Sequence, residues 1–126
     1  MKTLLWIDDI RDPLENDWLV FSPIGRDVDV HWVKSYSEFT EWVMKNGLPN
    51  AICFDHDLGG KKDGYDCAKW LVDYCIDNCK KLPDYAIQSA NPVGKENIDK
   101  LLKNYLKQSR NGSQIDFRES NTGCVN

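Results

Sequence analysis

The stretch that decides the fold is Ala51-Ile52-Cys53-Phe54-Asp55-His56-Asp57-Leu58-Gly59-Gly60. It begins with an apolar run that is too short for a helix, and this run ends abruptly in an acid, an imidazole, a second acid and two glycines. A short, fully apolar run is typical of a strand that is buried on both faces of a parallel sheet. Ligands of open α/β sheets bind outside the carboxyl ends of the strands, so we expect chemistry at this end.

Other segments show similar strand patterns. Residues 3–7 form an apolar run that ends in Asp8-Asp9, and residues 85–88 form a short strand followed by a polar turn at 89–92. Residues 28–33 alternate apolar and polar side chains before they become fully apolar, which is typical of a strand nearer the sheet edge. Together with residues 51–54, these segments predict a mainly parallel sheet.

Three helices are expected between and after these strands. The first follows Ser35 or Ser37; with Ser35 as cap, Glu38 has the spacing of a capping box, and the helix stops before Asn46-Gly47. The second runs from Asp63-Gly64 to about residue 78, and the third begins near residue 92. Residues 14–25 are expected to contain little or no regular helix. The order of elements predicts an α/β layer fold.

Composition limits the classes of protein that need to be considered. A chain of 126 residues, 41% hydrophobic and 29% charged, suits one compact soluble domain. We expect this domain to span residues 1–108, followed by a polar tail at 109–126 that either adds a short strand near residues 115–117 or stays loose. The net charge of −4 argues against an extended nucleic-acid surface but leaves a small nucleotide open as a ligand.

Neither a membrane span nor a secretory signal is expected from the sequence. No apolar run approaches transmembrane length, and the N-terminus becomes acidic too early for a signal peptide. The five cysteines include no Cys-x-x-Cys pair, which favours buried thiols in a reducing compartment over a zinc site. We therefore predict a cytoplasmic protein that does not contact membranes.

Polar groups follow three of the predicted strands and should meet at one edge of the sheet. They are Asp8 and Asp9; Asp55, His56 and Asp57; and Ser89 and Asn91. Taken singly, each group is an ordinary turn or helix cap, but their coincidence at strand ends indicates a site. Clustered carboxylates repel one another, and a hard divalent cation such as Mg²⁺ would relieve that repulsion. Serine and asparagine could hold a phosphoryl group without adding charge.

This arrangement resembles the receiver domain of two-component signalling, over roughly residues 3 to 107. The matching positions are Asp8-Asp9, the phosphorylatable Asp55, Asp63-Gly64 and Ser89-Ala90. The resemblance implies a receiver-like, flavodoxin-like three-layer sandwich with a mainly parallel sheet of about four or five strands. No lysine at the end of a fifth strand can be found, so the C-terminal end of the fold is expected to be truncated or altered.

The detailed motifs more closely resemble the cyclic-phosphate-processing receiver domain of bacteria and their viruses. The motif residues that this chain shares are Asp8, Asp9, Arg11, Asp55, His56, Asp57, Ser89, Asn91 and Asn97. Gln88 stands where the last motif commonly has histidine. The resemblance implies action on cyclic phosphate ends in RNA repair or nucleotide metabolism.

The leading hypothesis is therefore a metal-dependent phosphoesterase acting on a cyclic phosphate or related ester, either an RNA end or a cyclic nucleotide. Asp8, Asp9 and Asp57 would hold Mg²⁺ or Mn²⁺. Asp55 would be the nucleophile or a third metal ligand, and His56 a general acid or base. The phosphate would be bound by Arg11, Ser89 and Asn91.

Other functions remain open at this point. A phosphoaccepting receiver-type switch would use Asp55 as acceptor, and a non-catalytic protein would only bind and sequester a cyclic nucleotide. Phosphatases of the haloacid-dehalogenase type also place Asp-x-Asp after a strand, but that fold needs a longer core and a lysine late in the chain. The oligomeric state is not specified by the sequence.

Overall fold

Four parallel strands form the sheet in the computed structural model, in the order β2-β1-β3-β4. They are β1 (Thr3–Ile7), β2 (Asp29–Val33), β3 (Ala51–Phe54) and β4 (Asp84–Ile87). The structure describes residues 1–110, with the side chains of residues 108–110 left out. The central strands β1 and β3 are almost wholly buried, as their apolar runs predicted.

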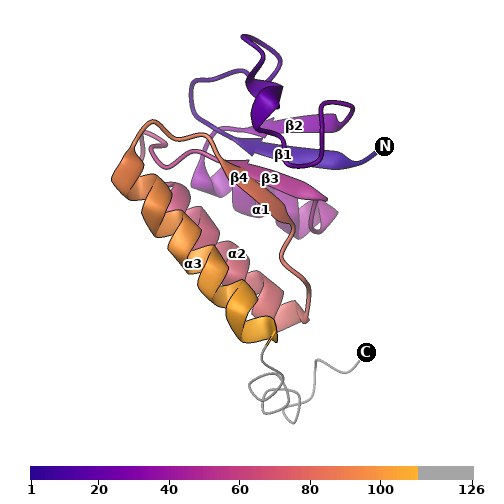
Figure 1. The fold of residues 1–126 in the computed structure, drawn as a ribbon, viewed down its shortest axis with the longest axis vertical. Coiled ribbons are helices and arrows are strands. Elements are labelled where there is room, and N and C mark those ends of the chain that lie inside the picture. Colours follow the sequence, from indigo (N-terminus) through magenta and orange to yellow (C-terminus); the bar gives the residue numbers. More distant parts are fainter. Residues whose placement is uncertain (111–126) are drawn as a thin grey trace.

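Three helices cover one face of the sheet (Figure 1). They are α1 (Tyr36–Asn46), α2 (Gly64–Asn78) and α3 (Pro92–Arg110). Their apolar stripes pack against the strand side chains that point to this face, and the main core forms there. Among its fully buried members are Leu5, Ile7, Phe39, Ile52, Phe54, Ile98 and Leu102.

The opposite face is covered by an irregular segment instead of a helix. This segment contains one short 3-10 helix, η1 (Trp18–Phe21), which confirms that no regular helix forms here. Trp18 and Leu19 pack on a second, smaller core built around Leu4, Trp6, Ala51 and Cys53. The predicted α/β flavodoxin-like fold is therefore present, with an irregular segment as its third layer.

The strand order places a topological switch point between β1 and β3. The chain leaves β1 toward β2 and then returns past β1 to reach β3. Because such crossovers are right-handed, the two connections lie on opposite faces of the sheet and diverge at this point. Ligand sites in flavodoxin-like sheets lie at the β1/β3 switch point, beside the carboxyl ends of those strands.

Local signals in the sequence account for most element boundaries. Ser35 caps α1, and its hydroxyl accepts a hydrogen bond from the Glu38 N–H at 3.1 Å. The Glu38 carboxylate, however, accepts from the Lys34 N–H, so the predicted capping box is incomplete. The complete capping box is at α2, between Asp63 and Asp66. The predicted added strand near residues 115–117 lies outside the described residues.

Three cysteines behave as predicted, because Cys53, Cys67 and Cys75 are free and buried. Burial raises the pKa of Cys53 to about 12 and that of Cys75 to about 11, so these thiols stay protonated. Cys79, which follows α2, is disulfide-bonded, so the prediction of a free thiol is wrong there. Within residues 1–110, no helix is both long and apolar enough to cross a membrane.

Candidate functional site

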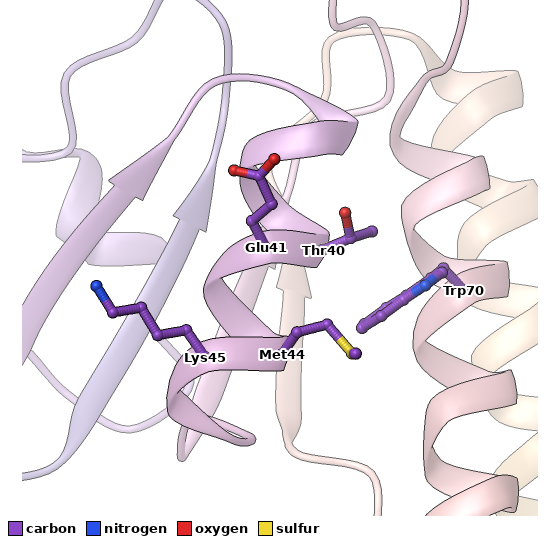
Figure 2. A pocket seen from close by; sticks show the side chains of 5 residues that line it. All are labelled: Thr40, Glu41, Met44, Lys45 and Trp70. Carbon is purple, nitrogen blue, oxygen red and sulfur yellow. The ribbon is translucent and has the colours of Figure 1, made fainter.

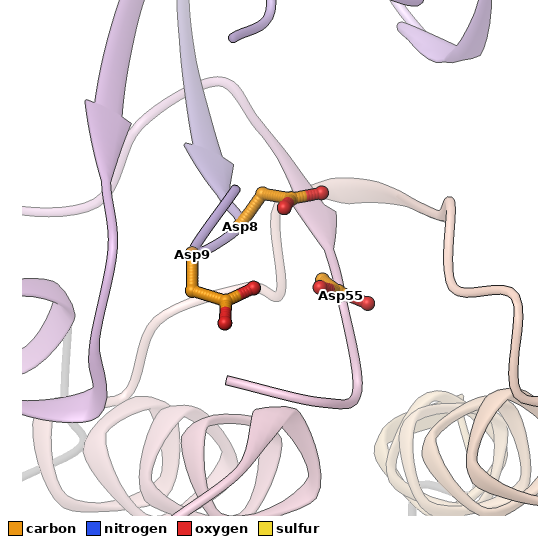
Figure 3. Close-up of side chains that lie close together, drawn as sticks. All are labelled: Asp8, Asp9 and Asp55. Carbon is orange, nitrogen blue, oxygen red and sulfur yellow. The ribbon is translucent and has the colours of Figure 1, made fainter. Parts of the chain in front are cut away.

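Three carboxylates converge at the switch point (Figure 3). Asp8 and Asp9 follow β1, Asp55 follows β3, and one oxygen from each lies within 4.8 Å of the others. Asp8 is fully buried and Asp55 is 5% exposed. The sequence predicted that these residues meet, and the structure brings them together. Oxygen ligands of this charge and spacing suit a hard divalent cation.

Arg11 is the basic side chain paired with this acidic cluster, defined as Asp8, Asp9 and Asp55. Its Nη1 lies 3.1 Å from Asp8 Oδ2 and 3.8 Å from Asp55 Oδ1. The other Asp8 oxygen accepts hydrogen bonds from the Ile10 and Arg11 N–H groups at 3.0 and 2.9 Å. The guanidinium also lies 5.1 Å from the centroid of a Trp18 ring. The loop after β1 is therefore folded around the Asp8 carboxylate.

Two indole groups hold this loop from the second core. Trp6 Nε1 donates to the Arg11 carbonyl at 3.0 Å, and Trp32 Nε1 donates to the Asp8 carbonyl at 2.7 Å. These tryptophans come from β1 and β2, so the sheet itself fixes the backbone that carries Asp8 and Asp9. Both side chains therefore act as structural residues at this site.

Burial raises the pKa of Asp55 from its ordinary value of 3.8 to about 6. Repulsion from the Asp8 and Asp9 carboxylates adds to this effect, whereas Arg11 and a hydrogen bond from the Asp57 backbone oppose it. Without a cation, the charged form of Asp55 is therefore disfavoured at this position.

Asp57 lies outside the acidic cluster, although the sequence analysis assigned it to the metal site. Its side chain is 67% exposed, and its Oδ1 lies 2.9 Å from His56 Nδ1. Hydrogen bonds from His56 and, secondarily, Asn91 lower the pKa of Asp57. Asp55, predicted as the nucleophile or a third metal ligand, is the third carboxylate of the cluster, and Asp57 is not part of it. The reason is that β3 ends at Phe54, so strand alternation does not extend to Asp57.

His56 joins the ends of three elements. Its Nε2 lies 3.4 Å from Asp63 Oδ2, and Asp63 is the N-cap of α2. Its ring lies against α3 so closely that a Cβ added at Gly94 would overlap it. Both ring nitrogens thus face carboxylates, on a side chain that is 17% exposed.

Ser89 and Asn91 shape the turn from β4 into α3. Asn91 Oδ1 accepts a hydrogen bond from the Gly94 N–H at 3.1 Å, and Ser89 Oγ accepts from the Asn91 N–H at 3.1 Å. The Asn91 side chain also hydrogen-bonds Asp57. Both residues therefore have structural partners, and within residues 1–110 the Ser89 hydroxyl is seen only as an acceptor.

Gln88 is the residue near the site that the sequence analysis missed. Its side chain is buried, and its Nε2 donates to the Ile7 carbonyl at 3.0 Å. In the sequence, Gln88 stands out only because the family motif commonly has histidine at this position. Its position directly after a strand, beside the end of β3, was the signal in the sequence that could have indicated a residue of the site.

An open pocket of about 540 Å³ lies elsewhere, between the outer sides of α1 and α2 (Figure 2). It is lined by Thr40, Glu41, Met44, Lys45 and Trp70. None of these residues belongs to the acidic cluster, and within residues 1–110 none forms a hydrogen bond or ion pair with it.

One comparison with a solved structure supports the fold. A chain described as the yeast Spc42 trimeric coiled coil, amino acids 181–211, fused to another structure matches with a TM-score of 0.59 and 19% identity, over 79% of this chain and 61% of that one. NtrX from Brucella abortus matches with a TM-score of 0.46 and 11% identity, over 91% of this chain and 29% of that one. The present chain thus spans less than two thirds of either structure. No curated protein matches it.

The family comparison covers most of the chain. The family described as "Cyclic-phosphate processing Receiver domain" matches residues 3–104. This range includes the four described strands, the acidic cluster, Arg11 and the turn into α3. The chain therefore belongs to the cyclic-phosphate-processing receiver domain family.

Proposed function

We propose that the protein is a metal-dependent phosphoesterase that opens a cyclic phosphate, on an RNA end or a nucleotide. The observation that carries this proposal is the convergence of Asp8, Asp9 and Asp55 within 4.8 Å, beside Arg11, at the switch point of the sheet. Family membership supports the substrate class, because the family is described by cyclic-phosphate processing. We also propose a cytoplasmic role in RNA repair or nucleotide metabolism.

The acidic cluster would hold Mg²⁺ or Mn²⁺. Its three carboxylates and the Arg11 guanidinium together carry a net charge of −2, which one divalent cation balances. A bound cation would neutralise charge on phosphoryl oxygens and lower the pKa of a coordinated water. The buried backbone of Asp8 and Asp55, fixed by the sheet and the indoles, would keep these ligands in place.

Arg11 and Ser89 would bind the phosphate. The Arg11 side chain is 27% exposed, and only its Nη1 is engaged by Asp8 and Asp55, so its other N–H groups can reach a phosphate oxygen. The Ser89 hydroxyl could donate to a second oxygen, while Asn91 would hold the turn that carries it. In this proposal, Asn91 supports phosphate binding mainly by holding Ser89 in place.

Ring opening forms one P–O bond to water and breaks one P–O bond to the sugar, whose oxygen then needs a proton. The acid–base role assigned to His56 from the sequence remains a prediction. Each His56 nitrogen faces a carboxylate, so proton transfer would require loss of one of these contacts. The geometry favours His56 as a positioning residue that holds the ends of β3, α2 and α3 together.

The test is incubation of the purified protein with Mn²⁺ or Mg²⁺ and a panel of 2′,3′-cyclic and 3′,5′-cyclic phosphates, with products identified by mass. We expect turnover that Asp55→Asn abolishes and that the matched control Asp73→Asn, an exposed acid on α2, retains. His56→Gln should lose about 10²–10⁴ in rate if His56 transfers the proton. Absence of turnover in the wild-type protein with every substrate would contradict the proposal.

A phosphoaccepting switch is the second candidate, because Asp55 lies buried at the end of β3 beside two acids in a receiver-type sheet. Incubation with a small phosphodonor and intact-mass measurement would reveal a phosphoryl group that Asp55→Asn cannot accept. A sequestering protein would instead bind a cyclic nucleotide and return it unchanged.

A further inference from the structure

Three buried polar side chains of the described residues lie in one row. Among residues whose side chains the structure describes, Asp8, Asp55 and Gln88 are the buried polar or charged ones. The ladder extends past the strand ends, since the Asp55 N–H donates to the Ile7 carbonyl at 3.0 Å and the Gln88 N–H to the Phe54 carbonyl at 2.9 Å. This register sets Asp8 beside Asp55 and Asp55 beside Gln88.

The three side chains also share a face of the sheet. Trp6, Cys53 and Ala86, each two residues earlier in its strand, all contribute to the second core. Because alternate residues of a strand point to the same face, Asp8, Asp55 and Gln88 continue that face beyond the core. Neighbouring strands are roughly 4.8 Å apart, so the Gln88 side chain leaves the sheet about one strand spacing from that of Asp55 and on the same face.

One atom of Gln88 has no partner. Its Nε2 donates to the Ile7 carbonyl, the same oxygen that accepts the Asp55 N–H, and this bond fixes the orientation of the amide. Its Oε1 is then buried without a hydrogen-bond partner among the described residues. An unpaired buried acceptor costs about 1–3 kcal/mol, so a donor or cation at this position would be favourable. Ionised carboxylates can supply neither.

We infer that the Gln88 amide oxygen is the fourth oxygen of the cation site, beside the carboxylates of Asp8, Asp9 and Asp55. This inference rests on the proposed function and specifies its metal site. An amide oxygen is a normal ligand for hard cations, and it adds no charge to a cluster that one divalent ion already balances. Gln88 is thereby a direct, uncharged ligand of the cation.

The experiment is a titration of the full-length protein with Mn²⁺, followed by the electron paramagnetic resonance signal of the free ion. Gln88→Met keeps the approximate length of the side chain but removes the oxygen. We expect its dissociation constant for Mn²⁺ to rise about tenfold or more. In EDTA, its thermal stability should equal or exceed that of the wild type, because the unpaired buried oxygen is gone. A purely structural glutamine would give lower stability and unchanged Mn²⁺ affinity, which would overturn the inference.

Three further variants make the outcome specific. Ile87→Val loosens β4 on the opposite face of the sheet and should leave Mn²⁺ affinity unchanged; weakening equal to that in Gln88→Met would overturn the inference. Gln88→Glu restores an oxygen and should bind Mn²⁺ at least as tightly as the wild type, even if Gln88→Met fails to fold; weaker binding would overturn the inference.

Asp55→Asn tests the site itself. If the wild type binds no Mn²⁺, the proposed metal-dependent function fails, whereas binding that depends on Asp55 but not on Gln88 removes only this inference.

Discussion

Asp55 carries a carboxylate that is buried next to two others, so its ionisation is unfavourable without a cation. Its pKa rises from 3.8 to about 6, which means that the folded state holds its proton more tightly than the unfolded state does. Stability from this group is therefore fully present below pH 3.8 and is lost as the pH rises to about 6.

Asp55→Asn should consequently stabilise the metal-free protein at pH 7.5 by about 2–3 kcal/mol relative to its effect at pH 4. The physical reason is removal of a buried charge from a cluster that repels it. Urea unfolding in EDTA at both pH values measures this difference, with Asp73→Asn as the exposed control. Equal effects of Asp55→Asn at the two pH values would contradict the assignment.

Residue identity at the site was only partly predictable from the sequence. Asp8, Asp9 and Asp55 were placed at the sheet edge because each directly follows an apolar run. Asp57 has the same parity as Asp55, but parity predicts direction only within a strand, and β3 ends before both residues. The Asp55 side chain keeps the direction set by β3, because the Asp55 N–H still donates to the Ile7 carbonyl of β1. The Asp57 side chain turns toward His56 instead. Such a difference depends on tertiary contacts that the local sequence does not contain.

At the level of elements, α3 packs unusually close to the end of β3. A Cβ at Gly94 would overlap the His56 ring, so only glycine permits this approach. Gly94→Ala should displace the ring and destabilise the protein by about 1–3 kcal/mol, even though alanine favours helix. The matched control is Gly60→Ala, since a Cβ there meets nothing within 4 Å. Thermal unfolding of the two variants compares them directly, and equal melting temperatures would exclude this close packing.

The strand β2 supports the loop after β1 through the 2.7 Å bond from Trp32 Nε1 to the Asp8 carbonyl. Trp32→Phe keeps an aromatic ring but removes this donor, and it should destabilise the protein by about 1–3 kcal/mol because the carbonyl loses its partner. It should also weaken Mn²⁺ binding, because Asp8 and Asp9 are carried by that loop. Trp42→Phe on α1 is the control for loss of an indole, and it should leave Mn²⁺ affinity unchanged. Weakened binding in both variants would argue against a specific role for Trp32.

For the whole molecule, the sequence predicted the parallel sheet and the three helices because each element has its own local signal, such as an apolar run, a cap or a glycine stop. It did not predict how the second face is covered. Residues 10–28 carry no helical periodicity, and their packing against Trp6 and Cys53 arises from contacts between distant segments. The position of Gln88 in the buried row was missed for the same reason, since it follows from the pairing of β4 with β3.

The described part of the chain contains two well-buried cores. Their buried members extend from Leu4 to Leu102, and the family match ends at residue 104. The protein ending at Arg110 should therefore fold with nearly the melting temperature of the full chain, and it should bind Mn²⁺ with the same affinity. Both proteins are to be measured with a reducing agent present, since Cys79 is disulfide-bonded.

Two opposite results would be informative for the predicted domain boundary. A shortened protein that melts clearly earlier, yet binds Mn²⁺ normally, would show that residues 111–126 stabilise the fold without contributing to the site. Loss of Mn²⁺ affinity at unchanged stability would instead place part of the site in those residues, and the cation site of Asp8, Asp9, Asp55 and Gln88 would be incomplete. Unchanged values for both measurements would confirm that the sheet, its three helices and the irregular layer suffice for folding and cation binding.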